Sequence, residues 1–195
     1  LAEAQRLSHT GSWAWDPIER KFIYVSEEML LMFGFDPQQG LPTPDQSLQR
    51  IHPDDWDKIK RARTMPEKAD FDFEYRIVLP DGTIKHVHAV AHPVLSPTAE
   101  ILEVVGTAVD ITERKRAEEA LSRLNRELRA ISNCNQVLLR ATDEQSLLEE
   151  ICRIVCEEAG FRMAWVAYAK HDEAKSVRPV AWTGAEEGYL ANLGI

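Results

Sequence analysis

The stretch from Val104 to Leu121, VVGTAVDITERKRAEEAL, changes its hydrophobic period halfway along. It begins as a β-branched run that is typical of a strand, and it ends as a charged stretch with sparse Ala and Leu at helical spacing. The sequence therefore predicts a strand that runs straight into a solvated helix near Thr112. This change of period marks the place where one folded domain ends.

The residues before this junction predict an α+β domain with a five-stranded antiparallel sheet. Two short strands come first, and three longer ones with alternating apolar residues and short turns between them come last. The expected strands are residues 12–16, 21–25, 70–79, 84–95 and 101–111. With a helical middle between the second and third strands, the order is β-β-helices-β-β-β.

Helices are expected at the start of the chain and between the second and third strands. Residues 1–11 are typical of the tail of a helix that ends near Gly11. Ser26 is a natural N-cap for a helix that Gly34 ends. Pro53 occupies the first turn of a further helix, where its missing N–H does no harm.

The strand order resembles that of the PAS sensor family over residues 8–121, together with the motifs IHPDDW, FEYRIVLPDGTIKHV and VVGTAVDITERKRAEEAL. The resemblance implies that the sheet and its flanking helices enclose a pocket and that the last strand feeds a signalling helix. It also implies that the signal passes through Asp110, Ile111, Thr112 and Glu113. Asp110 would then cap the helix, and Glu113 would complete a capping box.

From the junction onward, residues of a helical seam recur at alternating spacings of four and three, as in a coiled coil. The seam consists of Ala117, Leu121, Leu124, Leu128, Ile131, Asn135 and Leu138. Asn135 falls at a core position, where a single buried Asn sets register and dimer state. We expect a homodimeric coiled coil, and the alternative is an amphipathic helix packed on its own domain.

The last third of the chain predicts part of a second domain. Thr142 and Gln145 form a capping pattern for a helix that ends at Gly160, and a strand pair follows. ICRIVCEEAGFRMAWVAYAK and RPVAWTGAEEGYL resemble the first half of a GAF domain, from about residue 125 to the end. The expected domains are a PAS sensor at 1–111, a coiled-coil signalling helix at 112–140 and a truncated GAF half at 141–195.

Six aromatic side chains are candidates for lining a ligand pocket, with plain core packing as the alternative. They are Trp13, Trp15, Trp56, Phe71, Phe73 and Tyr75. PAS relatives that join flavin to a thiol use a cysteine in the middle helices, and residues 1–133 contain none, so that chemistry is excluded. Non-covalent flavin, and haem held by His52, are not favoured. His52 directly precedes Pro53, which indicates a capping role instead.

Three histidines, His86, His88 and His92, share one face of a predicted strand, where imidazoles can bind a metal. No carboxylate or further histidine is indicated to complete such a site, so we expect solvated or interface histidines and no metal. Cys152 and Cys156 stand one turn apart on an apolar helix, where cysteine usually serves as a small hydrophobe.

Composition and missing motifs exclude several functions. The formal net charge of -9 opposes binding to nucleic acid. No apolar run approaches the roughly 20 residues that span a bilayer, so no membrane contact is expected in this segment. The odd number of cysteines is typical of reduced, cytoplasmic protein. No phosphate loop, nucleophile elbow or metalloprotease helix is present in the sequence, so no enzyme is expected here.

These features predict a sensory input module from a longer, bacterial-type signalling protein, with a two-component sensor histidine kinase as the expected parent. Both ends of the chain indicate an internal piece. An unidentified small molecule or partner would shift the PAS sheet, and the dimeric coiled coil would pass the change to an output domain. The alternatives are a ligand-free dimerisation and spacer module, the input module of a diguanylate cyclase, and a coloured haem or flavin enzyme.

Overall fold

The computed structural model describes residues 9–64, 71–172, 176–185 and 188–190. The chain divides into two compact units, Leu1–Arg116 and Ala117–Ile195, and the boundary between them falls within one helix. None of the helices in the described ranges is long and apolar enough to cross a membrane.

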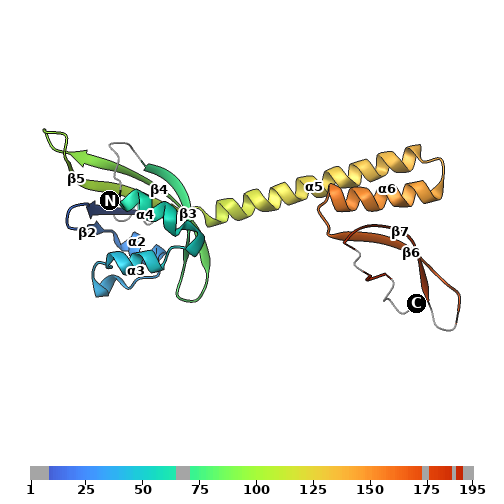
Figure 1. The fold of residues 1–195 in the computed structure, drawn as a ribbon, viewed down its shortest axis with the longest axis horizontal. Coiled ribbons are helices and arrows are strands. Elements are labelled where there is room, and N and C mark those ends of the chain that lie inside the picture. Colours follow the sequence, from blue (N-terminus) through green and yellow to red (C-terminus); the bar gives the residue numbers. More distant parts are fainter. Residues whose placement is uncertain (1–8, 65–70, 173–175, 186–187, 191–195) are drawn as a thin grey trace. The chain divides into compact units, whose positions relative to one another are not determined.

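The first unit contains a five-stranded antiparallel sheet, which confirms the fold that the alternating residues predict (Figure 1). The strands lie in the order β2-β1-β5-β4-β3, so the two halves of the sheet meet where β1 pairs with β5. Their bounds are β1 Thr10–Asp16, β2 Lys21–Val25, β3 Phe71–Val78, β4 Ile84–Leu95 and β5 Ile101–Asp110.

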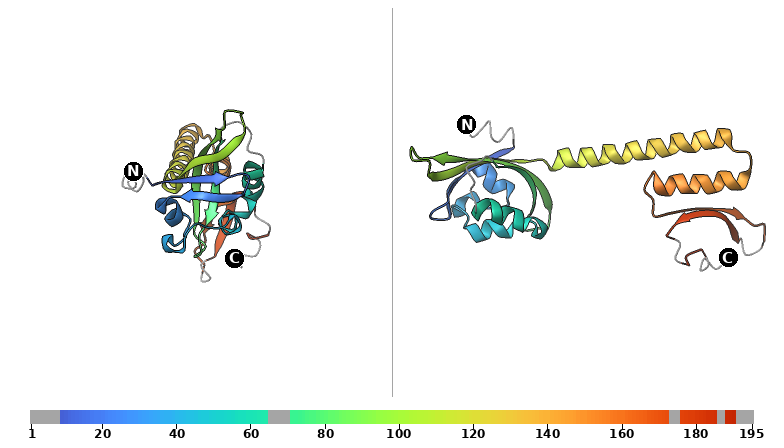
Figure 2. Two further views of the ribbon diagram at one scale, coloured as in Figure 1. Left: turned by 90° about the vertical axis from the view of Figure 1, so that its left-hand side faces the viewer. Right: turned by 45° about the horizontal axis from the view of Figure 1, so that its top comes forward.

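Short helices cover one face of this sheet (Figure 2). They are α2 Glu27–Met32, the 3₁₀ turn η1 Pro37–Gln39, α3 Pro44–Gln49, the 3₁₀ turn η2 Pro53–Asp55 and α4 Trp56–Thr64. Ser26 caps α2 as predicted, because its side chain accepts a hydrogen bond from the Met29 N–H at 3.3 Å. Gly34 follows the end of α2 with a φ of 69°, a conformation that glycine adopts without steric strain.

The core of the first unit lies between the sheet and these helices. Ile77 on β3, Val87 on β4 and Ala108 on β5 are fully buried, and α2 contributes Met29 and Leu30. Since successive side chains of a strand point to opposite faces, the period-two pattern assigns the inner face of β3 correctly, with Tyr75 and Ile77 buried.

The helix tail expected near Gly11 is wrong in its end point. Thr10 and Gly11 already belong to β1, where they pair with Val109 and Ala108 of β5. The sheet therefore supplies backbone partners that a helical reading of the local sequence could not anticipate. Residues 1–8 of the expected helix lie outside the described residues.

The second unit combines two helices with a two-stranded antiparallel sheet (Figure 1). The elements are α5 Thr112–Arg140, of which the unit holds the part from Ala117, α6 Glu144–Glu157, β6 Met163–Ala169 and β7 Val177–Gly184. Cys152 and Ile154 of α6 and Ala181 of β7 are almost fully buried. The predicted cap at Thr142 is displaced by one residue, because the Asp143 carboxylate accepts from the Ser146 N–H at 2.8 Å.

Gly106 on β5 leaves the space that the Trp13 indole fills. A Cβ at this position would lie 2.5 Å from Trp13 Cζ2 and 2.8 Å from the backbone oxygen of Val90. The Gly106→Ala variant should therefore lower the free energy of unfolding of the first unit by about 1–3 kcal/mol.

Urea titration followed by the indole NMR signal of Trp13 measures this effect. Thr107→Ser, at the exposed neighbouring position, is the control and should change stability by less than about 0.5 kcal/mol. Equal stability of the Gly106→Ala variant and the parent chain would contradict the close packing described.

Candidate functional site

An apolar cavity of about 100 Å³ lies between the inner face of the sheet and the helices of the first unit. Five of the six aromatic residues predicted for a pocket line it: Trp13, Trp15, Phe71, Phe73 and Tyr75. Aliphatic side chains such as Met29 and Ile59 complete the walls, and Ala89 and Ala91 of β4 form part of the floor. The predicted aromatic residues are therefore brought together around one space.

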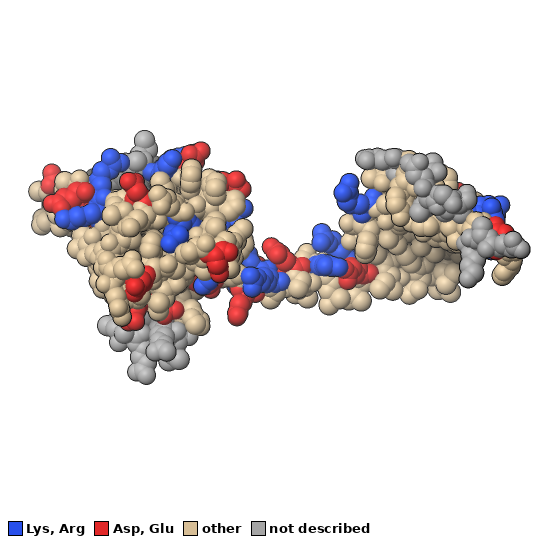
Figure 3. Space-filling model, turned by 90° about the horizontal axis from the view of Figure 1, so that it is seen from below, with Lys and Arg blue, Asp and Glu red and all other residues tan. Residues whose placement is uncertain are grey.

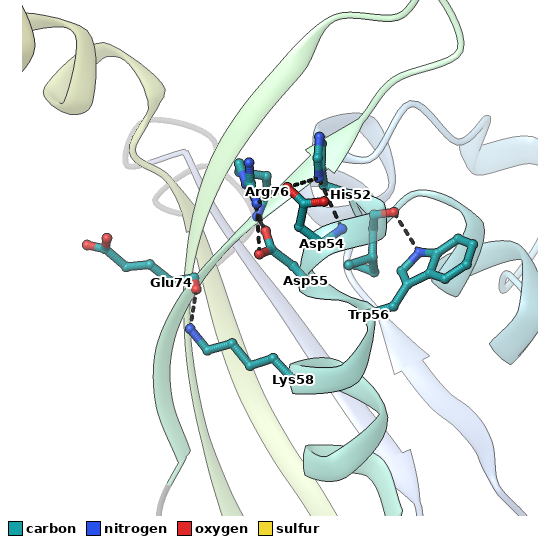
Figure 4. A network of polar contacts seen from close by, with 8 residues as sticks. His52, Asp54, Asp55, Trp56, Lys58, Glu74 and Arg76 are labelled. Atoms are coloured by element: carbon teal, nitrogen blue, oxygen red, sulfur yellow. Dashed lines mark hydrogen bonds and ion pairs between the residues drawn. The ribbon is translucent and has the colours of Figure 1, made fainter.

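Trp56, the sixth predicted residue, is not among the residues that line this cavity. Its indole N–H donates to the backbone oxygen of Ile51 at 2.9 Å, and the Lys60 ammonium lies 5.4 Å from the ring centroid. Trp56 thus stabilises the entry to α4 (Figure 4). The spacing of aromatic residues did not reveal this role of Trp56, because the hydrogen bond from its indole to Ile51 reaches across the η2 turn.

The described residues that line the cavity carry no charged side chain. The Ser47 hydroxyl among them already donates to the backbone oxygen of Pro44 at 2.8 Å. A charged ligand would have no counter-charge there, and burying an unpaired charge is strongly unfavourable. The volume of about 100 Å³ is also below the roughly 300–1,000 Å³ of pockets that hold drug-sized ligands.

His52 caps the η2 turn as predicted, and two carboxylates beside it bind a strand. The His52 Nδ1 accepts from the Asp54 N–H at 3.3 Å. Asp55 accepts two hydrogen bonds from the guanidinium of Arg76 on β3, at 3.0 and 3.1 Å, and one from the Arg76 backbone N–H (Figure 4). These hydrogen bonds outweigh desolvation and lower the pKa of Asp55.

The strand–helix junction is bound to β4 by the side chain of Thr112. The Thr112 hydroxyl donates to the Asp110 carboxylate at 2.5 Å and accepts from the backbone N–H of His86 at 2.9 Å. The Lys85 ammonium lies 3.0 Å from the other oxygen of Asp110, and the Ile111 N–H donates to the His86 oxygen at 2.9 Å. Ile111 and Thr112 are both buried, so the helix begins at packed residues that directly follow β5.

Burial of Asp110 would by itself raise its pKa, but the hydrogen bonds from Thr112 and Lys85 outweigh it, and the pKa lies below its usual value. Asp110 also accepts from the Thr112 N–H at 3.0 Å, which agrees with its predicted role as a cap. The capping box with Glu113 is wrong in its second half. Glu113 is exposed, and Lys85 from β4 is the side chain that binds Asp110.

The histidines of β4 are not arranged as a metal site. Among the described residues, no three His, Cys, Asp or Glu side chains lie close enough to hold an ion. His88 contacts the Asp72 carboxylate at 2.6 Å, and His86 serves the junction through its backbone. His92 lies four residues beyond His88 along the extended strand, too far to share an ion with it.

The cysteines of α6 occupy a packed environment. Cys152 is buried, and the Cys156 thiol donates to the backbone oxygen of Thr183 at 3.2 Å. Desolvation raises the pKa of Cys152 and of Cys134 on α5. A raised pKa disfavours the reactive thiolate, so these residues behave as small hydrophobes.

The seam predicted on α5 is exposed over its whole length. Ala117 and Asn135 are exposed, and Leu121, Leu124, Leu128, Ile131 and Leu138 each expose between 51% and 60% of their surface. A different face of α5 meets α6, where Ala130 is buried and the Asn133 amide donates to Glu158 at 2.6 Å. Basic and acidic side chains alternate on the part of α5 that leaves the first unit (Figure 3).

Residues 22–108 match the family model described as PAS fold. They form a PAS domain. The matched residues run from β2 to β5. β1 precedes them and completes the five-stranded sheet, which encloses the cavity together with the helices.

Solved and curated relatives agree with this assignment. A sensory box histidine kinase/response regulator from Burkholderia thailandensis is 27% identical, with a TM-score of 0.51 over 65% of this chain and 95% of that one. The probable diguanylate cyclase DgcE of Escherichia coli is 30% identical over 57% of this chain, and a methyl sulfide methyltransferase-associated sensor of Methanosarcina acetivorans is 34% identical over 56%. The matched residues span 10% and 11% of these two relatives.

Replacing Thr112 tests the junction of the PAS domain. Thr112→Val removes the hydroxyl and leaves the partly buried His86 N–H without its acceptor, so the domain should lose about 1–3 kcal/mol of stability. Urea titration with NMR detection of the Trp13 and Trp15 indoles measures the loss. Thr112→Ser keeps the hydroxyl and should lose less than half as much, whereas equal losses would show that the hydroxyl contributes nothing.

Proposed function

We propose that this chain is the sensory input region of a longer signalling protein and that two copies pair through α5. The PAS domain is a sensory module without catalytic groups of its own. The observation that carries the proposal is the exposed heptad seam, which starts five residues after the buried Thr112. A change in the sheet would reach the seam through Asp110 and Thr112.

The parent protein is proposed to be a sensor histidine kinase, with a diguanylate cyclase as the second candidate. The solved relative with 27% identity is a sensory box histidine kinase/response regulator, and the curated relative with 30% identity is a probable diguanylate cyclase. Residues 141–195 are proposed to be the start of a GAF domain, because α6 and the β6–β7 pair follow the predicted order of such a half. A histidine-containing dimerisation helix further along the parent chain would support the kinase, and a Gly-Gly-Asp-Glu-Phe loop would support the cyclase.

A parallel homodimer is the proposed use of the seam. Half-exposed leucines on one stripe of a helix leave apolar surface in water, and a second copy of the same stripe would bury it by knobs-into-holes packing. Asn135 would sit at an a position, where an Asn pair favours the parallel, in-register dimer at some loss of stability. Packing of this stripe on the chain's own domain, the alternative from the sequence, is not favoured by its exposure.

Leu121→Asp tests the dimer against a matched control on the adjacent residue. An Asp at a seam position would be buried beside its own copy, so the dissociation constant should rise at least ~10-fold. Ser122→Asp makes the same charge change on an exposed face outside the seam and should leave dimerisation within ~2-fold. Size exclusion with light scattering over a concentration series measures both. A monomer at high concentration for the unmodified chain would refute the dimer.

The signal that enters the PAS domain is proposed to be a small, neutral, apolar molecule. An engineered apolar cavity of about 150 Å³ stays dry and binds benzene or xenon, so a cavity of about 100 Å³ suits a molecule of similar or slightly smaller size. A bound molecule would press on Phe73 and Ile59, which line the space from β3 and α4. The competing function is a ligand-free scaffold with a sealed core.

Xenon and benzene are suitable probes for this cavity. Methyl NMR signals of Ile59, Ala89 and Ala91 should shift with saturation as either probe is added, because these side chains line the space. Ala91→Val adds two methyl groups to the cavity wall and should weaken the response at least ~5-fold. Unchanged methyl signals at saturating xenon would contradict ligand sensing through this cavity and favour the scaffold.

A further inference from the structure

Glu74 on β3 contacts both α4 and the first turn of α5. Its backbone oxygen accepts a hydrogen bond from the Lys58 ammonium of α4 at 2.6 Å, as Figure 4 shows. Its carboxylate binds the first turn of α5 through two cations, with Arg114 Nη2 at 2.8 Å from one oxygen and Lys115 Nζ at 2.6 Å from the other. We call this set of four residues the Glu74 clasp.

The clasp is one residue away from the cavity. Phe73 points inward and lines the cavity, while Glu74, the next residue of the same strand, points to the opposite face. The Lys58 ammonium also lies 5.3 Å from the centroid of the Phe73 ring, and the neighbouring Ile59 lines the cavity from α4. A displacement of Phe73 or of α4 would therefore move Glu74, because adjacent strand residues share one stiff backbone.

The clasp is suited to bias a conformation rather than to hold the fold. The Glu74 and Arg114 side chains expose 40% and 50% of their surface, and exposed ion pairs contribute little free energy each. The hydrogen bonds from Lys115 and then Arg114 lower the pKa of Glu74, so the carboxylate is charged at neutral pH. An interaction of this strength can open and close without unfolding the domain.

Arg114 also occupies a position of the heptad seam. It precedes Ala117 by three residues, which is the seam spacing, so the next seam position toward the N-terminus is a cation. Two copies of Arg114 brought together at the start of a parallel coiled coil would repel each other. While Glu74 binds Arg114, this charge is neutralised and is held on the sheet.

We propose that Glu74 is the positioning residue that couples the cavity wall to the first turn of α5. When Phe73 and α4 move, the contact with Lys58 changes, the carboxylate loosens its hold on Arg114 and Lys115, and the start of α5 becomes free to shift. This regulation rests on the proposed input function of the PAS domain. It adds a second connection between sheet and helix beside the Asp110–Thr112 junction.

Amide hydrogen exchange of the complete chain tests the clasp at the residues that it holds. Glu74→Gln removes the charge and should raise the exchange rates of the amides from Arg116 to Ala120 about 3- to 10-fold, because two weak ion pairs are lost together. Lys58→Met should raise the same exchange rates in α5, even though Lys58 does not contact α5 in the clasp and binds only the backbone oxygen of Glu74 on β3. Glu103→Gln removes one negative charge from β5, on the face of the sheet that also carries Glu74; it is the control and should leave these rates unchanged.

Each result decides one step. Unchanged rates in Glu74→Gln would overturn the clasp, and unchanged rates in Lys58→Met alone would overturn its coupling to α4. Equal increases in all three variants would show a nonspecific effect of substitution and would also overturn the clasp. In 1 M salt the difference between Glu74→Gln and the parent chain should disappear. If the chain were monomeric but the amide exchange rates of Arg116 to Ala120 still changed as expected, the dimer would be refuted and the clasp would stand. Failure of the proposed dimer can therefore be told apart from failure of the clasp.

Discussion

The hydroxyl of Thr112 connects the last strand of the sheet to the helix that follows it. It donates to Asp110 at the end of β5 and accepts from the backbone of His86 on β4, so one side chain satisfies both sides of the transition. Without this hydroxyl, the N–H of His86 would lose its acceptor and the Asp110 carboxylate would lose one of its donors.

The cavity and the junction belong to one sheet, and this is what allows one to influence the other. β4 contributes Ala89 and Ala91 to the cavity and, a few residues earlier, Lys85 and His86 to the junction. β3 contributes Phe73 to the cavity and Glu74 to the first turn of α5. A molecule in the cavity would thus act on two neighbouring strands that both contact the helix, and a few kcal/mol of differential binding would shift a two-state equilibrium.

Local patterns in the sequence predicted the elements and most of the cavity. Alternation placed Phe71, Phe73 and Tyr75 on one face of β3, and the capping residues Ser26 and His52 were recognised from their neighbours alone. Periods and caps are properties of a few adjacent residues, so one sequence is enough to show them. The heptad seam was found in the same way, and its role in a dimer stays a prediction.

The contacts that the sequence did not reveal join residues far apart in the chain. Arg76 binds Asp55, Lys85 binds Asp110, and Glu74 binds Lys115, and the residues of each pair become adjacent only in the folded domain. The charged positions of β3 and β4 resembled an ordinary solvated face for this reason. The capping box with Glu113 failed for a related reason, since Asp110 still belongs to β5 and pairs there with Val87 of β4.

Hydrogen exchange of the His86 and Ile111 amides tests the account most directly. The His86 N–H donates to Thr112, and the Ile111 N–H donates back to the His86 oxygen, so both report on the junction itself. If the junction is an integral part of the sheet, both amides should exchange only through unfolding of the whole PAS domain, as slowly as the amides of Val87 and Ala108 in the core. Exchange of these two amides at rates typical of a frayed helix end, with the core still protected, would contradict the central claim that α5 begins from a fixed point on the sheet.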